Sequence, residues 1–147
     1  MKKYVTGFLF SKDAKSLVLI KKISPAWQQG LFNGIGGKIE ANETSIDAMV
    51  REFFEETGVK TQPEGWTNYA KVYRPDCYDV DMFFGHSDLA FSAKTIEQEQ
   101  VVIVKVSELP NNLIPNLHWL IPLALDTQAD FSTPILVKEV AQIRSQA

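Results

Sequence analysis

Two short segments near the start of the chain, residues 3–10 and 16–23, have the composition of strands, and hydrophobic and polar positions alternate in the first of them. Alternation with a period of two is typical of β-strands, because successive side chains of a strand point to opposite faces of a sheet. The polar residues between the segments, around Lys12 and Asp13, are suited to a turn. The pattern therefore predicts an N-terminal β-hairpin.

The next stretch, residues 24–37, reads SPAWQQGLFNGIGG and contains Pro25 and four glycines. Glycine weakens regular structure because its backbone loses more conformational freedom on folding than that of any other residue. It also lets the backbone approach another group closely. We therefore predict a loop here, with its backbone close to a ligand or an ion.

A period of three to four residues appears in residues 41–58 and predicts an amphipathic helix. The side chains that share its apolar stripe are those of Ile46, Met49, Val50, Phe53 and Thr57. Asn42 or Thr44 can cap the start of this helix, and Gly58 is placed to end it.

Later segments extend the pattern to a mixed sheet with helices packed on it. The predicted strands are residues 67–75, 78–89 and 100–109, and the predicted helix is residues 115–126. The tail, residues 133–147, is compatible with either a last strand or a helix. This order of elements favours the α/β or α+β class.

Composition and charge narrow the classes of protein. The chain has 147 residues, 45% of them hydrophobic and 22% charged, which predicts a single globular domain spanning residues 1–147. A net charge of only −3 does not favour binding of a nucleic-acid polymer. A single cysteine, Cys77, excludes an internal disulfide framework, and no apolar run approaches the length of a membrane helix. We therefore expect a cytoplasmic protein that binds neither nucleic acid nor membrane.

The predicted helix carries three glutamates, Glu52, Glu55 and Glu56, on the side away from its apolar stripe. Like charges at this spacing repel by roughly 0.2–0.5 kcal/mol per pair on an isolated helix. The cluster can be a solvated acidic face, since charged residues are usually exposed to water. It can also be a site for a hard divalent cation, which prefers carboxylate and carbonyl oxygens.

The residues around the cluster favour the cation site. Residues 37–59, GKIEANETSIDAMVREFFEETGV, match the pattern G-x5-E-x7-R-E-U-x-E-E-x-G-U without a departure, where U is a bulky apolar residue. This segment resembles the Nudix box, and the chain resembles a Nudix hydrolase. The resemblance implies an α/β/α sandwich with a mixed β-sheet. It also implies hydrolysis of a pyrophosphate bond in a nucleoside diphosphate linked to another group.

The resemblance also assigns roles to residues. It implies that Mg²⁺ or Mn²⁺ is held by the carboxylates of the cluster and the Gly36 carbonyl, with Glu97 or Glu99 from a later loop completing the site. The metal set that we predict is Gly36, Glu52, Glu55, Glu56 and Glu99. We predict Glu52, Glu55 and Arg51 as the catalytic group.

Within that group, Glu52 or Glu55 is the candidate general base. Arg51 is expected to act mainly through structure, by pairing with a carboxylate such as Glu43. His86, His118 and Cys77 are interpreted as packing or surface residues, because none has a spaced partner in the sequence.

The substrate must be inferred from residues outside the box. The stretch WQQGLFNGIGGKIE resembles the MutT-like branch, whose members act on nucleoside triphosphates, including oxidised ones. The predicted substrate-binding residues are Lys22 (or Lys21), Asn33 with Phe32 or Trp27, Gly37, Lys38 and Asn116. An asparagine amide can both donate to and accept from the edge of a base.

Two other functions stay open. Pro75 lies at a position that tends to accompany hydrolysis of ADP-ribose in the family, so an ADP-ribose or nucleotide-sugar pyrophosphatase is the second hypothesis. A nucleotide-binding sensor is the third, although sensors often lack one or more box glutamates and this chain has them all. The partner is expected to be a small-molecule nucleotide, and the protein a monomer or a homodimer.

Overall fold

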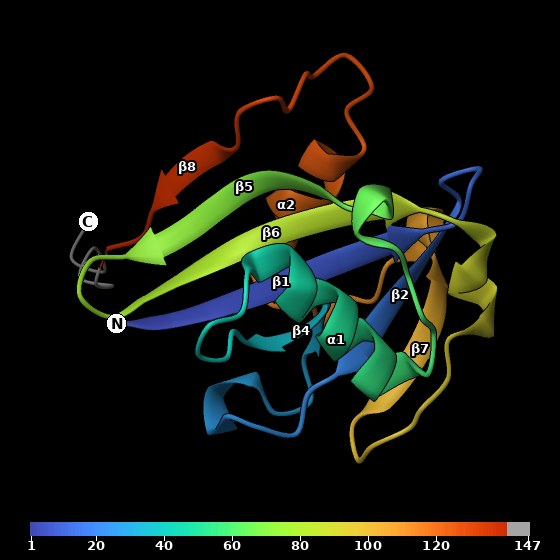
Figure 1. Cartoon of the computed structure of the whole chain (residues 1–147). Helices are drawn as coiled ribbons and strands as arrows, with labels where there is room; N and C mark the ends of the chain where they lie inside the picture. The colour runs from blue at the N-terminus through green and yellow to red at the C-terminus, as the bar shows by residue number, and fades with distance from the viewer. Residues whose placement is uncertain (141–147) are drawn as a thin grey trace, which may run out of the picture.

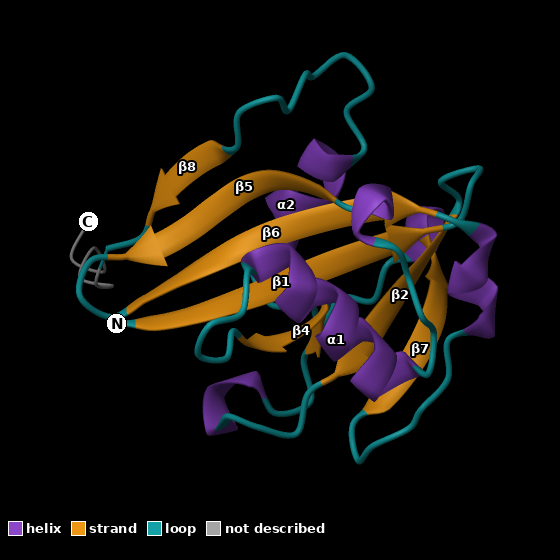
Figure 2. Cartoon of the chain, viewed as in Figure 1, coloured by secondary structure: helices purple, strands orange, loops and turns teal. Residues whose placement is uncertain are grey.

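The computed structural model describes residues 1–140 and contains a mixed eight-stranded sheet with two α-helices (Figures 1 and 2). The strands are β1 (Lys2–Phe10), β2 (Ser16–Lys21), β3 (Phe32–Asn33), β4 (Ile35–Lys38), β5 (Thr67–Arg74), β6 (Tyr78–His86), β7 (Gln100–Lys105) and β8 (Ile135–Lys138). The helices are α1 (Ser45–Thr57) and α2 (Leu117–Ala124). In this described part of the chain, neither helix has the length and apolarity needed to span a membrane.

The strand directions place the first residues of β1 and the last residues of β8 at the same end of the sheet. The order is β3-β2-β1-β6-β5-β8, while β4 pairs with β1 and β7 pairs with β2. β1 runs parallel to β6, in register from Lys2 opposite Tyr78 to Phe10 opposite His86. β8 runs parallel to β5 at the edge. The first residues of β1 therefore lie beside the start of β6, two strands from β8.

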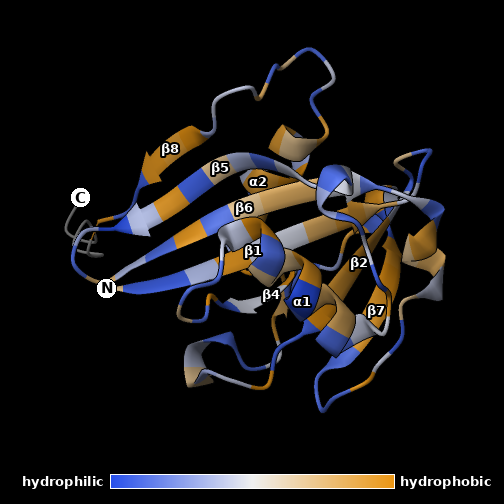
Figure 3. Ribbon diagram, viewed as in Figure 1, coloured by the Kyte–Doolittle hydropathy of each residue, from blue (hydrophilic) through white to orange (hydrophobic). Residues whose placement is uncertain are grey.

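The two helices cover opposite faces of the sheet, so the predicted α/β/α sandwich with a mixed sheet is confirmed (Figure 1). The period of two in β1 explains the layers, because Val5 and Leu9 pack in the cluster with α1 while Phe8 and Phe10 pack in the cluster with α2. Figure 3 shows the same alternation of hydrophobic and hydrophilic residues along β5. Each face of the sheet therefore has its own core.

Helix α1 has the boundaries that its capping residues predict. Of the two proposed caps, Thr44 is the one used: its hydroxyl oxygen accepts from the Asp47 amide at 3.2 Å. Gly58 follows the last turn in the left-handed conformation, with a φ of 77°. Met49 and Phe53, from the predicted apolar stripe, are fully buried.

The predicted loop at residues 24–37 is wrong in its second half, which forms β3 and β4. β4 pairs antiparallel with β1, from Tyr4 opposite Lys38 to Gly7 opposite Ile35. A Cβ added at Gly36 would lie 1.9 Å from the Val5 carbonyl oxygen, closer than any real contact. The glycines here permit a strand to lie unusually close to its neighbour, a tertiary reason that overrides their weak strand propensity.

Other boundaries shift by a few residues. β7 ends at Lys105 and a short 3-10 helix follows at Val106–Glu108, so the predicted strand 100–109 is too long. Helix α2 begins at Leu117 rather than at residue 115. For the tail, the strand alternative is confirmed at Ile135–Lys138, and residues 141–147 lie outside the described residues.

The close approach of β4 to β1 gives the first testable prediction. We expect Gly36→Ala to lower the free energy of unfolding by about 3 kcal/mol or more, because the added methyl group must displace the backbone of β1. Urea denaturation followed by circular dichroism measures this change. Gly65→Ala is the matched control, because a Cβ at Gly65 meets no atom within 4 Å. Equal stabilities of the two variants would contradict the prediction.

Candidate active site

Helix α1 presents its glutamates beside β4. Met49 and Phe53 anchor the helix to the core. The prediction that all three glutamates lie away from the apolar stripe is wrong for Glu56, because residues seven apart share a helical face and Glu56 is buried on the same side as Met49. A Cβ added at Gly37 would lie 2.5 Å from the carboxyl carbon of Glu52. The missing side chain of Gly37 therefore leaves the space that the Glu52 carboxylate occupies.

Arg51 is the positive group among these carboxylates. Its guanidinium binds both carboxylate oxygens of Glu43, with Nε to Oε2 at 2.7 Å and Nη2 to Oε1 at 2.9 Å. Nη1 also donates to Glu52 at 2.8 Å and to Glu55 at 3.1 Å. The predicted pairing of Arg51 with Glu43 is thus present, and it is part of a larger cluster.

The same contacts shift the acid–base behaviour of the pair. The hydrogen bond with Glu43 is the largest cause that raises the pKa of Arg51. The hydrogen bond with Arg51 is likewise the largest cause that lowers the pKa of Glu43. Arg51 also donates from Nη2 to the Lys38 carbonyl at 3.0 Å, which ties the end of β4 to the helix.

Glu56 is in a different environment. Its side chain is largely buried, and its Oε2 atom is buried without any hydrogen-bond partner in the described structure. Burial, followed by the nearby charge of Glu52, raises the pKa of Glu56 to about 8. An unpartnered buried carboxylate next to other carboxylates destabilises a fold unless a cation compensates for its charge.

The two candidate acidic residues of the later loop occupy different positions. Glu99 is engaged: its Oε1 accepts from Lys22 Nζ at 3.0 Å and its Oε2 from the Ile23 amide at 2.6 Å. Burial has the largest single effect on the pKa of Glu99 and raises it. The contacts with Ile23 and Lys22 together outweigh burial, so the pKa of Glu99 is lower than usual. Glu97 is exposed, and its charge contributes to the raised pKa of Glu52. Both line one pocket with Glu56.

The donor set suits Mg²⁺ or Mn²⁺, since such hard cations prefer carboxylate oxygens. Within residues 1–140, however, no three acidic, histidine or cysteine side chains already surround a point where a metal ion could sit. The hydrogen bonds of Arg51 to Glu52 and Glu55 explain this arrangement. Cation binding would therefore involve the transfer of at least one of these carboxylates from the guanidinium to the ion.

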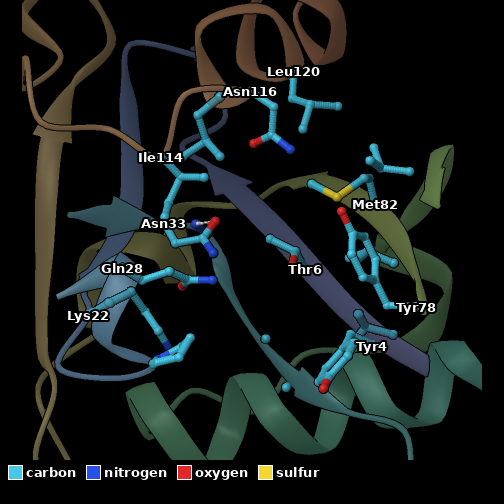
Figure 4. Close-up of a pocket in the computed structure, with 18 of the residues that line it drawn as sticks. Tyr4, Thr6, Lys22, Gln28, Asn33, Tyr78, Met82, Ile114, Asn116 and Leu120 are labelled. Atoms are coloured by element: carbon cyan, nitrogen blue, oxygen red, sulfur yellow. Dashed lines mark hydrogen bonds between the residues drawn. The ribbon is translucent and has the colours of Figure 1, made fainter. Parts of the chain in front are cut away.

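A pocket of about 380 Å³ lies beside this cluster, on the face of the sheet that carries α2. Figure 4 shows Lys22 and Gln28 on one side of it and Tyr78 and Met82 on the other. Gly36 and Gly37 also line it, so the pocket reaches the strand that contacts the glutamates. Its volume is in the range of small-molecule sites.

Most of the predicted substrate-binding residues line this pocket. They are Lys22, Asn33, Gly37 and Asn116, with Trp27 as the aromatic neighbour. Lys38 is not among the lining residues; it is exposed, and only its carbonyl oxygen contacts the site, through Arg51. Of the two aromatic alternatives, Trp27 lines the pocket and Phe32 does not.

Several polar residues of the pocket are not predicted from the sequence. They are Tyr4, Thr6, Gln28, Tyr78 and Glu139. The period of two in β1 could have revealed two of them, because Tyr4 and Thr6 share a face with Phe8. No local pattern indicates Glu139, because it comes from the far end of the chain and reaches the pocket only through the pairing of β8 with β5.

His86 and His118 lie outside the pocket. His86 stacks on Phe10 with ring centroids 5.3 Å apart, and burial lowers its pKa. His118 is exposed on α2, and Cys77 is exposed in the turn before β6.

A mixed sheet between two helices, with an intact box on α1 beside a nucleotide-sized pocket, defines a protein of the Nudix type. The chain belongs to the Nudix family: the model of the NUDIX domain matches residues 2–122.

Curated relatives are similar over a shorter segment. The chain is 34% identical over 64 residues to "Phosphatase NudJ" of Escherichia coli strain K12 and to the protein of the same name from Shigella flexneri. This segment is 44% of the chain and 40% of each relative. The chain thus spans less than half the length of these relatives.

Solved structures share the fold at low sequence identity. A NUDIX hydrolase from Nitrosomonas europaea has a TM-score of 0.67 and 16% identity, covering 94% of this chain and 79% of that chain. A structure from a study of MutT from Aliivibrio salmonicida and Vibrio cholerae has a TM-score of 0.62 and 23% identity, covering 83% and 98%. These similarities support the fold.

Proposed function

We propose that this protein hydrolyses a pyrophosphate bond of a nucleoside triphosphate, releasing the monophosphate and pyrophosphate, with Mg²⁺ or Mn²⁺ as cofactor. The observation that carries the proposal is the buried carboxylate of Glu56, whose Oε2 atom has no partner in the described structure. It lies in a complete box beside a pocket of nucleotide size. A divalent cation provides the compensating charge that this carboxylate lacks.

Each part of the site has a role in this reaction. Glu52, Glu55 and Glu56 would hold the cation with the Gly36 carbonyl, and Glu97 or Glu99 would complete the set. A bound divalent ion neutralises phosphate charge and lowers the pKa of water. Glu52 or Glu55 accepts the proton of the attacking water, and the leaving pyrophosphate carries away the electron pair of the broken P–O bond. Arg51 orients these carboxylates.

The pocket favours a nucleoside as the group that occupies it. Asn33 and Asn116 both extend into the pocket (Figure 4). The Oδ1 atom of Asn33 accepts from the Gly34 amide at 2.8 Å, so its NH₂ group is the part of the amide that is left to donate to a nucleoside. Asn116 occupies the N-cap position of α2, yet its side chain makes no capping hydrogen bond. Both amides can therefore read the edge of a base, and the exposed Trp27 can stack on it.

The alternative substrate is ADP-ribose or a nucleotide sugar. Pro75 supports it through its location in the turn between β5 and β6, three positions before Tyr78, which lines the pocket. A sensor without catalysis remains the third hypothesis, and the intact glutamate cluster argues against it.

A product assay tests these three functions. Purified protein with Mg²⁺, and then Mn²⁺, is given unmodified and oxidised nucleoside triphosphates, ADP-ribose and nucleotide sugars, with Glu56→Gln as the blank. We expect monophosphate and pyrophosphate from a triphosphate. AMP and ribose phosphate from ADP-ribose would support the alternative. Tight binding of a nucleotide without turnover of any compound would support the sensor.

A further inference from the structure

The charged residues that line the nucleotide pocket lie on opposite sides of it. Among the described residues, Lys22 and Glu139 are the only charged side chains of the lining. Lys22 comes from the strand end next to the glycines, on the side opposite Tyr78 (Figure 4). Glu139 is bound to Tyr78 and so lies at the other side. Because Lys22 is already paired with Glu99 at 3.0 Å, the clearer effect is at the other side, where the carboxylate of Glu139 disfavours an anionic phosphate chain.

Backbone pairing holds Glu139 in this position. β8 pairs parallel with β5 from Ile135 opposite Ala70 to Lys138 opposite Tyr73. The ladder continues one residue further, because the Glu139 amide donates to the Tyr73 carbonyl at 2.7 Å. The side chain of Glu139 thus extends from a fixed point of the sheet edge toward the pocket.

The contact with Tyr78 fixes the side chain as well. The Tyr78 hydroxyl donates to Oε1 of Glu139. Burial, followed by this hydrogen bond and the charge of Glu139, raises the pKa of Tyr78 to about 12, so the phenol keeps its proton at neutral pH. A carboxylate offers about four acceptor positions, and Tyr78 uses one of them. The phenol oxygen can also accept a hydrogen bond, so the pair presents acceptors and no free donor.

From this placement we infer that Glu139 and Tyr78 determine nucleotide specificity, by accepting hydrogen bonds from a donor group of the nucleoside. The inference rests on the proposed nucleotide pocket. The donor is either a ribose hydroxyl or an amino group of the base, since both are neutral donors that a carboxylate binds well. The same carboxylate disfavours a second anionic group at this side of the pocket.

Glu139 lies outside the part of the chain that the family model matches. The NUDIX domain matches residues 2–122, so β8 and Glu139 lie beyond it. Tyr78 is inside the matched segment, and the Glu139 side chain that orients it is not. The proposed specificity feature therefore includes a residue from outside the matched segment.

Equilibrium binding tests the inference without depending on turnover. Guanosine triphosphate with a non-hydrolysable α,β-methylene bridge is compared by calorimetry with its 2′-deoxy form and with the inosine counterpart, which lacks only the amino group. We expect wild type to bind the complete nucleotide about tenfold more tightly than one of the two truncated forms. Which form loses affinity identifies the hydroxyl or the amino group as the donor.

The isosteric variant Glu139→Gln should remove most of this tenfold preference, while its amide oxygen still accepts from Tyr78. Glu108→Gln, an exposed glutamate outside the pocket, is the matched control and should keep the preference. An unchanged preference in Glu139→Gln, or no preference in wild type, would overturn the inference. If the protein binds the nucleotide with a preference that depends on Glu139 but does not hydrolyse it, only the proposed hydrolysis is contradicted and the specificity inference stands.

Discussion

Replacing Glu56 by glutamine is expected to reduce nucleotide hydrolysis by about a thousandfold or more, because a divalent cation contributes several kcal/mol to catalysis and each 1.4 kcal/mol is about tenfold in rate. Glu56 is the carboxylate of the cluster that Arg51 does not contact, and its Oε2 atom has no partner in the described structure. It is therefore the carboxylate most available to a cation. Initial rates at saturating Mg²⁺ measure the effect.

The matched control is Glu64→Gln, an exposed glutamate of the 3-10 helix at Pro63–Gly65. This variant should keep the wild-type rate. A rate for Glu56→Gln within threefold of wild type would mean that Glu56 does not hold the catalytic cation.

The metal-free protein gives a second readout for Glu56. Its folded-state pKa of about 8 lies above the ordinary glutamate pKa of 4.5, so between these values the folded state binds more protons than the unfolded state. The stability that protonated Glu56 contributes is fully present below pH 4.5 and is lost as the pH rises through about 8. Glu56→Gln should therefore have a higher Tm than wild type at pH 8 and nearly the same Tm at pH 4.5. Thermal unfolding in chelator measures both, and added Mg²⁺ should reduce the difference at pH 8.

Replacing Arg51 by methionine is expected to lower the free energy of unfolding by about 3 kcal/mol, because removing one partner of a shielded ion pair leaves the other charges uncompensated. Arg51 is only 25% exposed and contacts Glu43 and Glu52, whose side chains are 16% and 14% exposed. All three are thus partly withdrawn from water. Hydrolysis should also fall, since Glu52 and Glu55 would lose the donor that orients them.

The pH dependence separates the ion pair from simple packing. Arg51 lowers the pKa of Glu43, so the pair stabilises the fold at neutral pH and this stability is lost as the pH falls below the usual range of a glutamate. The difference in denaturation midpoint between wild type and Arg51→Met should therefore narrow toward pH 3. Arg51→Lys keeps one charge without the two-pronged contact to Glu43 and should be intermediate. A difference that is constant with pH would contradict the electrostatic explanation.

Several features of the site could be predicted from the sequence because they depend on local spacing. The helix and its caps follow from a period of three to four residues with Thr44 and Gly58 at the ends. The pairing of Arg51 with Glu43 is implied by the resemblance to the Nudix box, and the structure contains it.

Other features could not be predicted, because they depend on contacts between distant segments. Gly34, Gly36 and Gly37 predict a loop, whereas Gly36 enables β4 to pair closely with β1. Glu99 was selected as a metal ligand, and the structure shows its carboxylate in contact with Lys22. That contact joins residues 77 positions apart, which no local pattern reveals.

The sequence by itself determined the strands of the first hairpin, the amphipathic helix and the identity of the clustered carboxylates, because side-chain periodicity and backbone propensity act over a few residues. Only the tertiary structure decided which carboxylate is neutralised and which is not. Arg51 engages Glu52 and Glu55, whereas burial against the sheet leaves the Oε2 atom of Glu56 without a hydrogen-bond partner in the described structure. It also decided that Glu139 reaches the pocket, because pairing of β8 with β5 brings the two ends of the described chain together.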